Sequence, residues 1–244
     1  MSEVAGRMSV QAGAVCLEKS YGGAGLLLGG VPGVESANVL ILGGGVVGRN
    51  ALKMAVGMEA NVTVVDKSLD TLRDLDEIYA NRIQTIYSTQ EAIETCVLNA
   101  DLIIGAVLIP GAASPKLVST DLIKRMKPGS VVVDVAIDQG GCFETSKATT
   151  HDNPTYLVHD VVHYCVANMP GAVAKTSAIA LNNATLPFVL QLANQGTVKA
   201  LQSNSHLFEG LNVWKGQVIN EHIAQQHGYE FNTIGPGQLN VSTH

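Results

Sequence analysis

Residues 38–48 read NVLILGGGVVG, a short apolar run followed at once by a complete G-x-G-x-x-G pattern. Residues 49–58 fit a helix, and residues 62–65 form a second apolar run that fits a strand. Asp66 closes this second strand, 18 residues after Gly48. A strand, a glycine turn, a helix, a strand and a terminal acid, in this order and spacing, form the fingerprint of a dinucleotide-binding unit.

The three glycines of the pattern have different expected roles. Gly43 permits the tight turn, Gly45 leaves room for a pyrophosphate, and Gly48 allows the helix to pack closely on the sheet. The N–H groups of the first helical turn then face the phosphates, at the positive end of the helix dipole. Asp66 would accept hydrogen bonds from a ribose diol and repel a 2′-phosphate, which favours NAD over NADP. The alternative is a glycine-rich turn that binds nothing.

The composition excludes several classes of protein. Of 244 residues, 46% are apolar, which is enough for a sizeable core. A net charge of −6 and an aromatic content of 5% argue against nucleic acid as a partner. The four cysteines form no C-x-x-C pair and predict reduced thiols in a cytosolic protein: Cys16, Cys96, Cys142 and Cys165. We see no leader and no apolar run that could span a bilayer, so we expect a soluble, cytoplasmic protein.

Beyond the opening unit, apolar strands alternate with helices. The sequence predicts strands at residues 39–42, 62–65, 82–87, 101–107 and 131–137. It predicts helices at residues 47–58, 70–79, 90–98 and 120–126. Strands that are apolar along almost their whole length, with helices between them, are typical of a parallel sheet covered on both faces. We therefore expect an α/β fold built on a doubly wound parallel sheet.

The two ends of the chain follow this rhythm less closely. Residues 2–20 have helix-like spacing, and the glycine-rich residues 22–33 predict a loop. Two further strands are predicted at residues 156–159 and 164–166, and two helices at residues 177–194, despite Pro187, and 214–226. From about residue 203 onward the alternation of strands and helices is lost.

His159, His163 and Cys165 lie close enough in sequence to raise the question of a zinc site. The stretch 157–166 reads as extended apolar structure, however, and no second ligand pair follows at a finger-like spacing. We therefore predict packing or surface histidines and no metal.

Five further stretches carry a resemblance to a known family. They are MSEVAGR at 1–7, GGVPGV at 29–34, IGAVLIPG at 104–111, DVAIDQGG at 134–141 and VANMP at 166–170. Together they resemble the alanine dehydrogenase family and, more distantly, the NAD-binding part of proton-translocating transhydrogenase. The resemblance runs in order over nearly the whole chain. It implies a Rossmann-type fold, NAD as cofactor, and a reaction in which L-alanine, NAD and water give pyruvate, ammonium and NADH.

The resemblance implies that Asp138 is the catalytic aspartate beside the nicotinamide. Asp138 lies just past the carboxyl end of a predicted parallel strand, where open α/β sheets bind ligands. Without the resemblance, Asp138 reads as a strand-end aspartate that caps a turn, and Asn168 as part of a plain turn. Thr71 stands where the family can place a lysine, so one cofactor contact is weakened.

The other implied cofactor contacts are spread along the chain. They are Ser2 at the pyrophosphate, Gly43, Gly45, Val46, Val47 and Gly48 in the turn, Asp66 at the ribose, Ser88 at the adenine, Val107 and Leu108 over the cofactor, and Val135, Ala136, Ile137 and Asp138 with Val166, Ala167, Asn168 and Met169 around the nicotinamide.

The resemblance also divides the chain into four segments. They are a connecting helix at 1–22, the NAD-binding Rossmann domain at 23–170, a connecting helix at 171–202, and a remnant of a substrate domain at 203–244. In the family, the substrate domain is built mainly from sequence that precedes the segment opening this chain. We therefore expect a truncated protein, a split gene product or a fragment that is incomplete for turnover by itself.

The expected partners are L-alanine or pyruvate, together with further copies of the chain or a complementing N-terminal segment. Two alternatives to the dehydrogenase remain open. The chain can be a non-catalytic NAD-binding module of a split enzyme or complex, or the NAD-binding component of a transhydrogenase.

Overall fold

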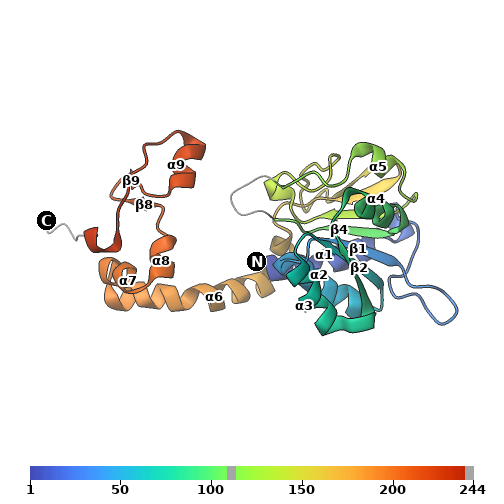
Figure 1. Cartoon of the computed structure of the whole chain (residues 1–244), viewed down its shortest axis with the longest axis horizontal. Coiled ribbons are helices and arrows are strands. Elements are labelled where there is room, and N and C mark those ends of the chain that lie inside the picture. Colours follow the sequence, from blue (N-terminus) through green and yellow to red (C-terminus); the bar gives the residue numbers. More distant parts are fainter. Residues whose placement is uncertain (109–113, 240–244) are drawn as a thin grey trace. The chain divides into compact units, whose positions relative to one another are not determined.

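The computed structural model describes residues 1–108 and 114–239. These residues divide into two compact units, with the boundary between Ser177 and Ala178. The first unit contains a seven-stranded sheet with helices on both faces (Figure 1). The predicted doubly wound α/β fold is confirmed. None of the helices in the described residues is both long enough and apolar enough to cross a membrane.

The strand order of the sheet decides where a ligand can bind. The strands are β1 (Asn38–Leu42), β2 (Asn61–Asp66), β3 (Ile83–Tyr87), β4 (Leu102–Gly105), β5 (Val131–Asp134), β6 (Thr155–Val158) and β7 (Val161–Tyr164). They lie in the order β3-β2-β1-β4-β5-β7-β6, and every neighbouring pair is parallel except β6 with β7. The chain leaves β1 toward one side and later returns to its other side at β4. This reversal opens a crevice at the carboxyl ends of β1 and β4.

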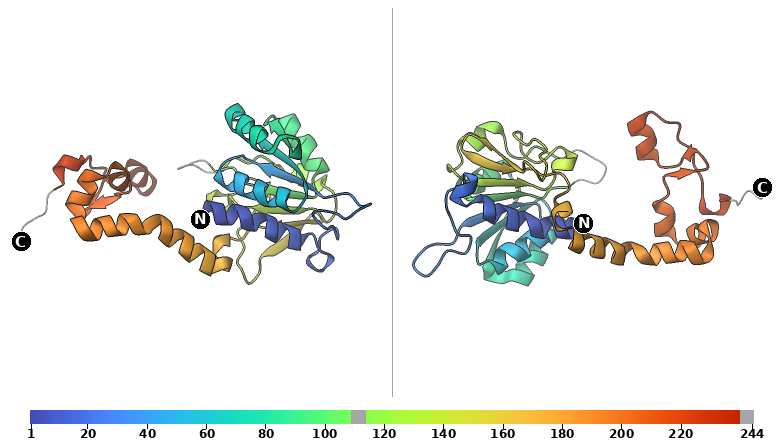
Figure 2. Two further views of the ribbon diagram at one scale, coloured as in Figure 1. Left: turned by 90° about the horizontal axis from the view of Figure 1, so that it is seen from below. Right: turned by 180° about the vertical axis from the view of Figure 1, so that it is seen from behind.

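Helices cover both faces of the sheet. Figures 1 and 2 show α1 (Ser2–Cys16), α2 (Val46–Gly57) and α3 (Leu69–Tyr79) on one face, and α4 (Gln90–Asn99) with α5 (Thr120–Lys124) on the other. Strand β1 supplies both cores: Val39 and Ile41 pack on the side of α1 and α2, whereas Leu40 and Leu42 pack toward α4 and α5. Because both faces are buried, the strand has no polar alternation.

The edge hairpin differs from the prediction. β6 and β7 are antiparallel and joined by His159 and Asp160, whose φ angles are +50° and +59°. Two consecutive residues with positive φ are typical of a type I′ hairpin turn, which usually contains Asn-Gly. Because His-Asp does not give that signal, the predicted strand at 164–166 was wrong, and the second strand is Val161–Tyr164.

Two central strands also end earlier than predicted. β4 ends at Gly105 instead of residue 107, because Gly105 pairs with Leu42, the last residue of β1. β5 ends at Asp134 instead of residue 137, because the Asp134 side chain bonds to the N–H of Ala136 and the chain turns there. Asp138 consequently lies in a short 3-10 helix, Ile137–Gln139, four residues beyond the strand.

The second unit contains most of α6 (Ala174–Gln195), then α7 (Thr197–Ser203), α8 (Ser205–Glu209), the hairpin β8 (Val213–Trp214) with β9 (Gln217–Val218), and α9 (Glu221–His227). The predicted helix at 214–226 was wrong in its first half. Lys215 and Gly216 have positive φ and form the hairpin turn. The helix begins only after Asn220, whose side chain accepts a bond from the N–H of Ile223. Further 3-10 turns lie at Lys19–Tyr21, Ala80–Arg82, Met169–Val173 and Pro236–Gln238.

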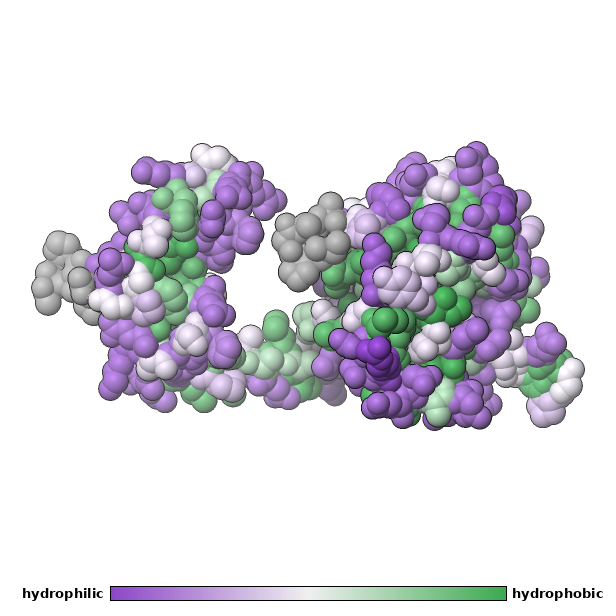
Figure 3. All heavy atoms as spheres, in the orientation of Figure 1, coloured by the Kyte–Doolittle hydropathy of each residue, from purple (hydrophilic) through white to green (hydrophobic). Residues whose placement is uncertain are grey.

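Helix α6 exposes an unusual amount of apolar surface, as Figure 3 shows along this helix. Its exposed apolar residues are Ile179, Leu181, Leu186, Phe188, Val189 and Leu190, each between 39% and 55% accessible. A helix with apolar residues on several sides is normally covered by other protein. This surface therefore favours association of the chain.

We predict that the chain associates in solution in a concentration-dependent way and that the double substitution Leu186→Gln with Val189→Gln reduces this association. The change removes apolar area from one side of α6. Small-angle scattering at several concentrations measures it, with Thr185→Gln as a control on the same helix. A monodisperse monomer at all concentrations would contradict the prediction.

Gly48 fixes how closely α2 approaches β1. A Cβ on Gly48 would overlap the carbonyl oxygen of Gly43. We predict that Gly48→Ala destabilises the protein by about 3 kcal/mol or more, because backbone atoms cannot yield as side chains do. Gly57→Ala, at the exposed end of the same helix, meets nothing within 4 Å and should stabilise the protein by about 0.5–1 kcal/mol. Denaturant unfolding measures both, and equal stabilities would refute the packing role.

Candidate dinucleotide-binding site

Three adjoining hollows lie at the carboxyl edge of the sheet. We name them the Asp138 hollow (about 370 Å³), the glycine-turn hollow (about 410 Å³) and the Ser88 hollow (about 210 Å³). Ser2, Val47 and Leu108 line both the Asp138 and glycine-turn hollows, and the glycine-turn and Ser88 hollows share Gly43, Asp66 and Val107. The shared lining residues make the three hollows one continuous groove, which suits an extended ligand with several parts.

The middle of the groove is the end of helix α2. Gly43 has a φ of +99°, and its N–H donates to the Val65 carbonyl, which fixes the turn. Gly45 is the N-cap of α2 and offers no side-chain acceptor to the first helical turn. A Cβ on Gly45 would meet nothing within 4 Å, so the backbone here faces open space. The helix N-terminus therefore presents N–H groups and a positive dipole to the groove, which suits a phosphate.

Asp66 lies at the end of β2 and holds the glycine turn directly. Its Oδ2 accepts a bond from the N–H of Gly44 at 2.6 Å, and its Oδ1 accepts one from the N–H of Ser68 at 2.7 Å. An ionised carboxylate has about four acceptor sites, so two remain for a ligand. This arrangement fits a ribose diol. Thr71 lies beside the turn: a Cβ on Gly44 would come within 2.7 Å of its methyl group.

The Ser88 hollow is an apolar slot. Leu42, Val65, Val107 and Leu117 form its walls, and Ser88 lies at its edge, held by a bond from its N–H to the Asp66 carbonyl. A narrow apolar slot beside a ribose acceptor has the character needed for a planar base such as adenine.

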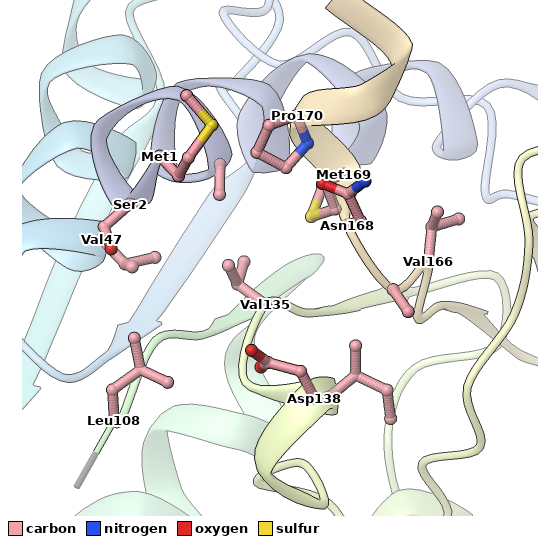
Figure 4. A pocket seen from close by; sticks show the side chains of 13 residues that line it. Met1, Ser2, Val47, Leu108, Val135, Asp138, Val166, Asn168, Met169 and Pro170 are labelled. Atoms are coloured by element: carbon pink, nitrogen blue, oxygen red, sulfur yellow. The ribbon is translucent and has the colours of Figure 1, made fainter. Parts of the chain in front are cut away.

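The Asp138 hollow is mostly apolar and carries one carboxylate. Figure 4 shows that its walls come from the start of α1, the start of α2, Leu108 after β4, the loop after β5 and the loop after β7. Asp138 is exposed and lines the hollow together with Val135 and Ile137 of the same loop. Asn168, in the loop after β7, has a left-handed conformation with a φ of +60° and also lines the hollow. A carboxylate at an apolar wall can take up or return a proton at a bound substrate.

Most of the residues implied from sequence lie on this groove. Gly48 and Ala136 are exceptions: Gly48 packs against the turn, and Ala136 is fully buried beneath the loop. Further residues line the groove that the sequence did not predict as cofactor contacts. All but Lys67 are apolar, and no sequence pattern distinguishes an apolar cavity wall from ordinary core. These residues are Met1, Ala5, Leu42, Val65, Lys67, Ala106, Pro115, Leu117 and Pro170. Residues 109–111 of the stretch that carries the resemblance lie outside the described residues.

Among the described residues, no histidine or cysteine lines this groove. His163 is fully buried, and its Nε2 lies 2.7 Å from the hydroxyl of Thr145; burial lowers the pKa of His163, which keeps the ring neutral. His159 is exposed in the hairpin turn. Among residues 1–108 and 114–239, no group of three His, Cys, Asp or Glu side chains could hold a metal ion. All four cysteines are free, and burial raises the pKa of Cys142 to about 11, so this thiol stays protonated.

Comparison with known proteins decides the family. The family model described as "Alanine dehydrogenase/PNT, C-terminal domain" matches residues 9–221. The chain belongs to this family. It is 61% identical over 231 residues to an alanine dehydrogenase of Halomonas elongata and 56% identical over 235 residues to alanine dehydrogenase 2 of Staphylococcus aureus. These matches cover 95% and 96% of this chain but only 62% and 63% of those proteins.

Solved structures agree with this membership of the alanine dehydrogenase/PNT family. An L-alanine dehydrogenase structure superposes with a TM-score of 0.89 at 53% identity, over 92% of this chain and 62% of that one. A transhydrogenase structure from Sinorhizobium meliloti has a TM-score of 0.62 at 23% identity, over 73% of this chain and 51% of that one, and shares the fold. The chain therefore spans about three fifths of the length of its alanine dehydrogenase relatives.

We predict that Asp66→Ala weakens NADH binding by about 1–3 kcal/mol, because a ribose in the groove loses its charged acceptor. The preference for NADH over NADPH should also fall, since the repulsion of a 2′-phosphate disappears. Fluorescence titration with both nucleotides measures the two effects.

The matched control for this ribose prediction is Asp70→Ala. It removes the same charge from an exposed residue in the first turn of α3, where Asp70 bonds only to Arg73 among the described contacts. It should leave both affinities unchanged. An Asp66→Ala variant that binds NADH as well as the parent chain would discard the ribose role.

Proposed function

We propose that this chain binds NAD in the groove and provides the cofactor domain of an NAD-dependent L-alanine dehydrogenase. The observation that carries the proposal is the continuity of the groove, from an adenine-sized slot past a helix N-terminus to a carboxylate in an apolar hollow. Each part matches one part of a dinucleotide: base and ribose, pyrophosphate, and the reacting ring.

The residues present fit NAD. Gly45 leaves open space where a side chain would block a pyrophosphate, and Asp66 retains acceptors for a ribose. Ser2 stands at the junction of two hollows, beside the first turn of α2. Val135, Ile137, Val166 and Met169 make an apolar wall that excludes water from a ring lying against it. Bound NAD supplies hydride acceptance from the α-carbon of L-alanine.

Asp138 is the proton-handling group in this proposal. L-alanine, NAD and water give pyruvate, ammonium, NADH and a proton. The carboxylate of Asp138 accepts a proton from the water that attacks the imine carbon of the oxidised substrate. It lines the hollow, and no arginine, lysine or histidine side chain lies beside it among the described lining residues. The side-chain amide of Asn168, in the loop after β7, would orient a polar group of the bound nicotinamide or substrate.

The Asp138 hollow is chemically incomplete for this reaction. Its described lining contains no arginine, lysine or histidine side chain, although a substrate carboxylate needs a cationic partner. We therefore propose that the chain does not turn over alone, and that a complementing N-terminal segment or another copy of the chain supplies this group. In this proposal the chain consists of a connecting helix (1–22), the NAD-binding domain (23–170), a connecting helix (171–202) and a remnant of a substrate domain (203–244). The proposed place of action is the cytoplasm.

The same incompleteness favours a second candidate function, a non-catalytic NAD-binding module of a split enzyme or complex. Two measurements separate the candidates. Fluorescence titration tests whether the chain binds NADH. Reduction of NAD with L-alanine is then followed, with and without the part of the Halomonas elongata relative that lies outside its match to this chain. Failure to bind NADH would overturn both candidates, and binding without turnover in any mixture would favour the module.

We predict that, in the complemented mixture, Asp138→Asn lowers the rate of L-alanine oxidation by about 10²–10⁴-fold while NADH still binds, because the proton acceptor is lost. Asp152→Asn, at an exposed residue outside the groove lining, is the matched control and should leave the rate unchanged. An Asp138→Asn variant with the parent rate would remove Asp138 from the chemistry.

A further inference from the structure

Asp134 is a buried carboxylate that the proposed reaction does not use. It is the last residue of β5 and has no accessible surface. Three donors converge on it: the N–H of Ala136 at 3.2 Å, the N–H of Cys142 at 2.9 Å, and the hydroxyl of Ser146. An ionised carboxylate only accepts hydrogen bonds, so all three donors suit the charged form.

The first two donors stand near the two ends of one loop. Residues 135–142 leave β5 and contribute Val135, Ile137 and Asp138 to the Asp138 hollow. One carboxylate thus ties Ala136, near the start of the loop, to Cys142, at its end. The N–H of Gly141 also donates to the Ala136 carbonyl at 3.0 Å, which closes the loop at the same place.

Two glycines make room for the carboxylate. Gly141 has a φ of +80°, and a Cβ there would overlap Oδ2 of Asp134. A Cβ on Gly105, in the neighbouring strand β4, would lie 3.1 Å from Oδ1. The backbone is therefore shaped around this side chain, and a larger residue at position 141 cannot coexist with the Cys142 bond.

A buried carboxylate such as Asp134 has a cost in stability, because its charged form loses its contact with water. Burial raises the pKa of Asp134, whereas its three hydrogen bonds and the positive charge of Lys116 act in the opposite direction. Lys116 itself donates to the carbonyls of Gly140 and Phe143, so the cation also holds this loop. A buried ion is weak support for stability, because an apolar residue could fill the same volume at less cost.

We propose that Asp134 is a positioning residue, which fixes loop 135–142 so that Val135, Ile137 and Asp138 face the nicotinamide end of the groove. This inference rests on the proposed NAD site. It assigns the carboxylate no contact with ligand: Asp134 acts through the backbone of the loop. Binding groups held by such supporting bonds keep their geometry to within fractions of an ångström.

The test compares a ligand that reaches the loop with one that does not. NADH extends to the Asp138 hollow, whereas ADP-ribose lacks the nicotinamide and occupies the other two hollows. We expect Asp134→Asn to raise the Kd of NADH about tenfold, the loss of one or two hydrogen bonds to a charged group. The Kd of ADP-ribose should stay unchanged. The fluorescence enhancement of bound NADH should fall as well, because its ring loses a fixed wall.

The matched control is Asp101→Asn, which alters another buried carboxylate in the same unit. Asp101 accepts bonds from the N–H of Asn38 at 2.8 Å and from Lys127 at 2.8 Å, at the start of β4 and away from the groove. This variant should lose stability and keep both ligand affinities. Ser146→Ala removes the donor that holds Oδ2 of Asp134 in place, the same oxygen that accepts the Cys142 bond. Because this loosens the hold of the carboxylate on the loop, it should raise the Kd of NADH alone, by about two- to fivefold.

The outcomes separate this inference from the function it rests on. If the parent chain does not bind NADH, the proposed function fails and the inference falls with it. If the parent binds and Asp134→Asn binds NADH equally well, or loses NADH and ADP-ribose equally, the positioning role alone is overturned. If Asp134→Asn does not fold, Ser146→Ala decides, and an unchanged Kd for NADH in that variant overturns the proposal.

Discussion

The approach of helix α2 to the turn after β1 is the constraint on which the rest of the site depends. Gly48 lies against the carbonyl oxygen of Gly43, so α2 starts directly above the end of the central strand. Its free N-terminal N–H groups thereby face the crevice that the strand order opens. Gly6 allows a similarly close approach of α1 to α2, because a Cβ on Gly6 would overlap the Val47 carbonyl oxygen. The start of α1 consequently reaches the groove and lines it with Ser2.

Aspartates at strand ends give this edge of the sheet its order. Asp66 ends β2 and bonds to the Gly44 turn, while Asp134 ends β5 and bonds to the loop that carries Asp138. Asp66 thus fixes the turn after the neighbouring strand β1, and Asp134 fixes the loop that follows its own strand. The two differ in burial. Asp66 is partly accessible and keeps acceptor sites for a ligand, whereas Asp134 is buried and accepts hydrogen bonds from protein groups.

The sheet could be predicted from the sequence because both of its faces are buried. Strands buried on both faces, such as β1 and β5, are apolar along almost their whole length. The sequence also predicted the glycine turn and Asp66, whose roles follow from spacing. It failed where side chains redirect the backbone. The Asp134 carboxylate ends β5 earlier than predicted. His159 and Asp160 form a turn that lacks the usual sequence signal, and Lys215 with Gly216 forms a turn where the sequence predicts a helix. Apolar lining such as Ala106 looked like ordinary core, because nothing in its pattern distinguishes a cavity wall.

The position of the first helix has one more consequence. Met1 and Ser2 both belong to the wall of the Asp138 hollow, with Asp138 and Asn168 across from them. Any polypeptide joined ahead of Met1, whether a natural extension or a purification tag, therefore starts at the wall of this hollow. The space left for a bound molecule then depends on where the first joined residues lie.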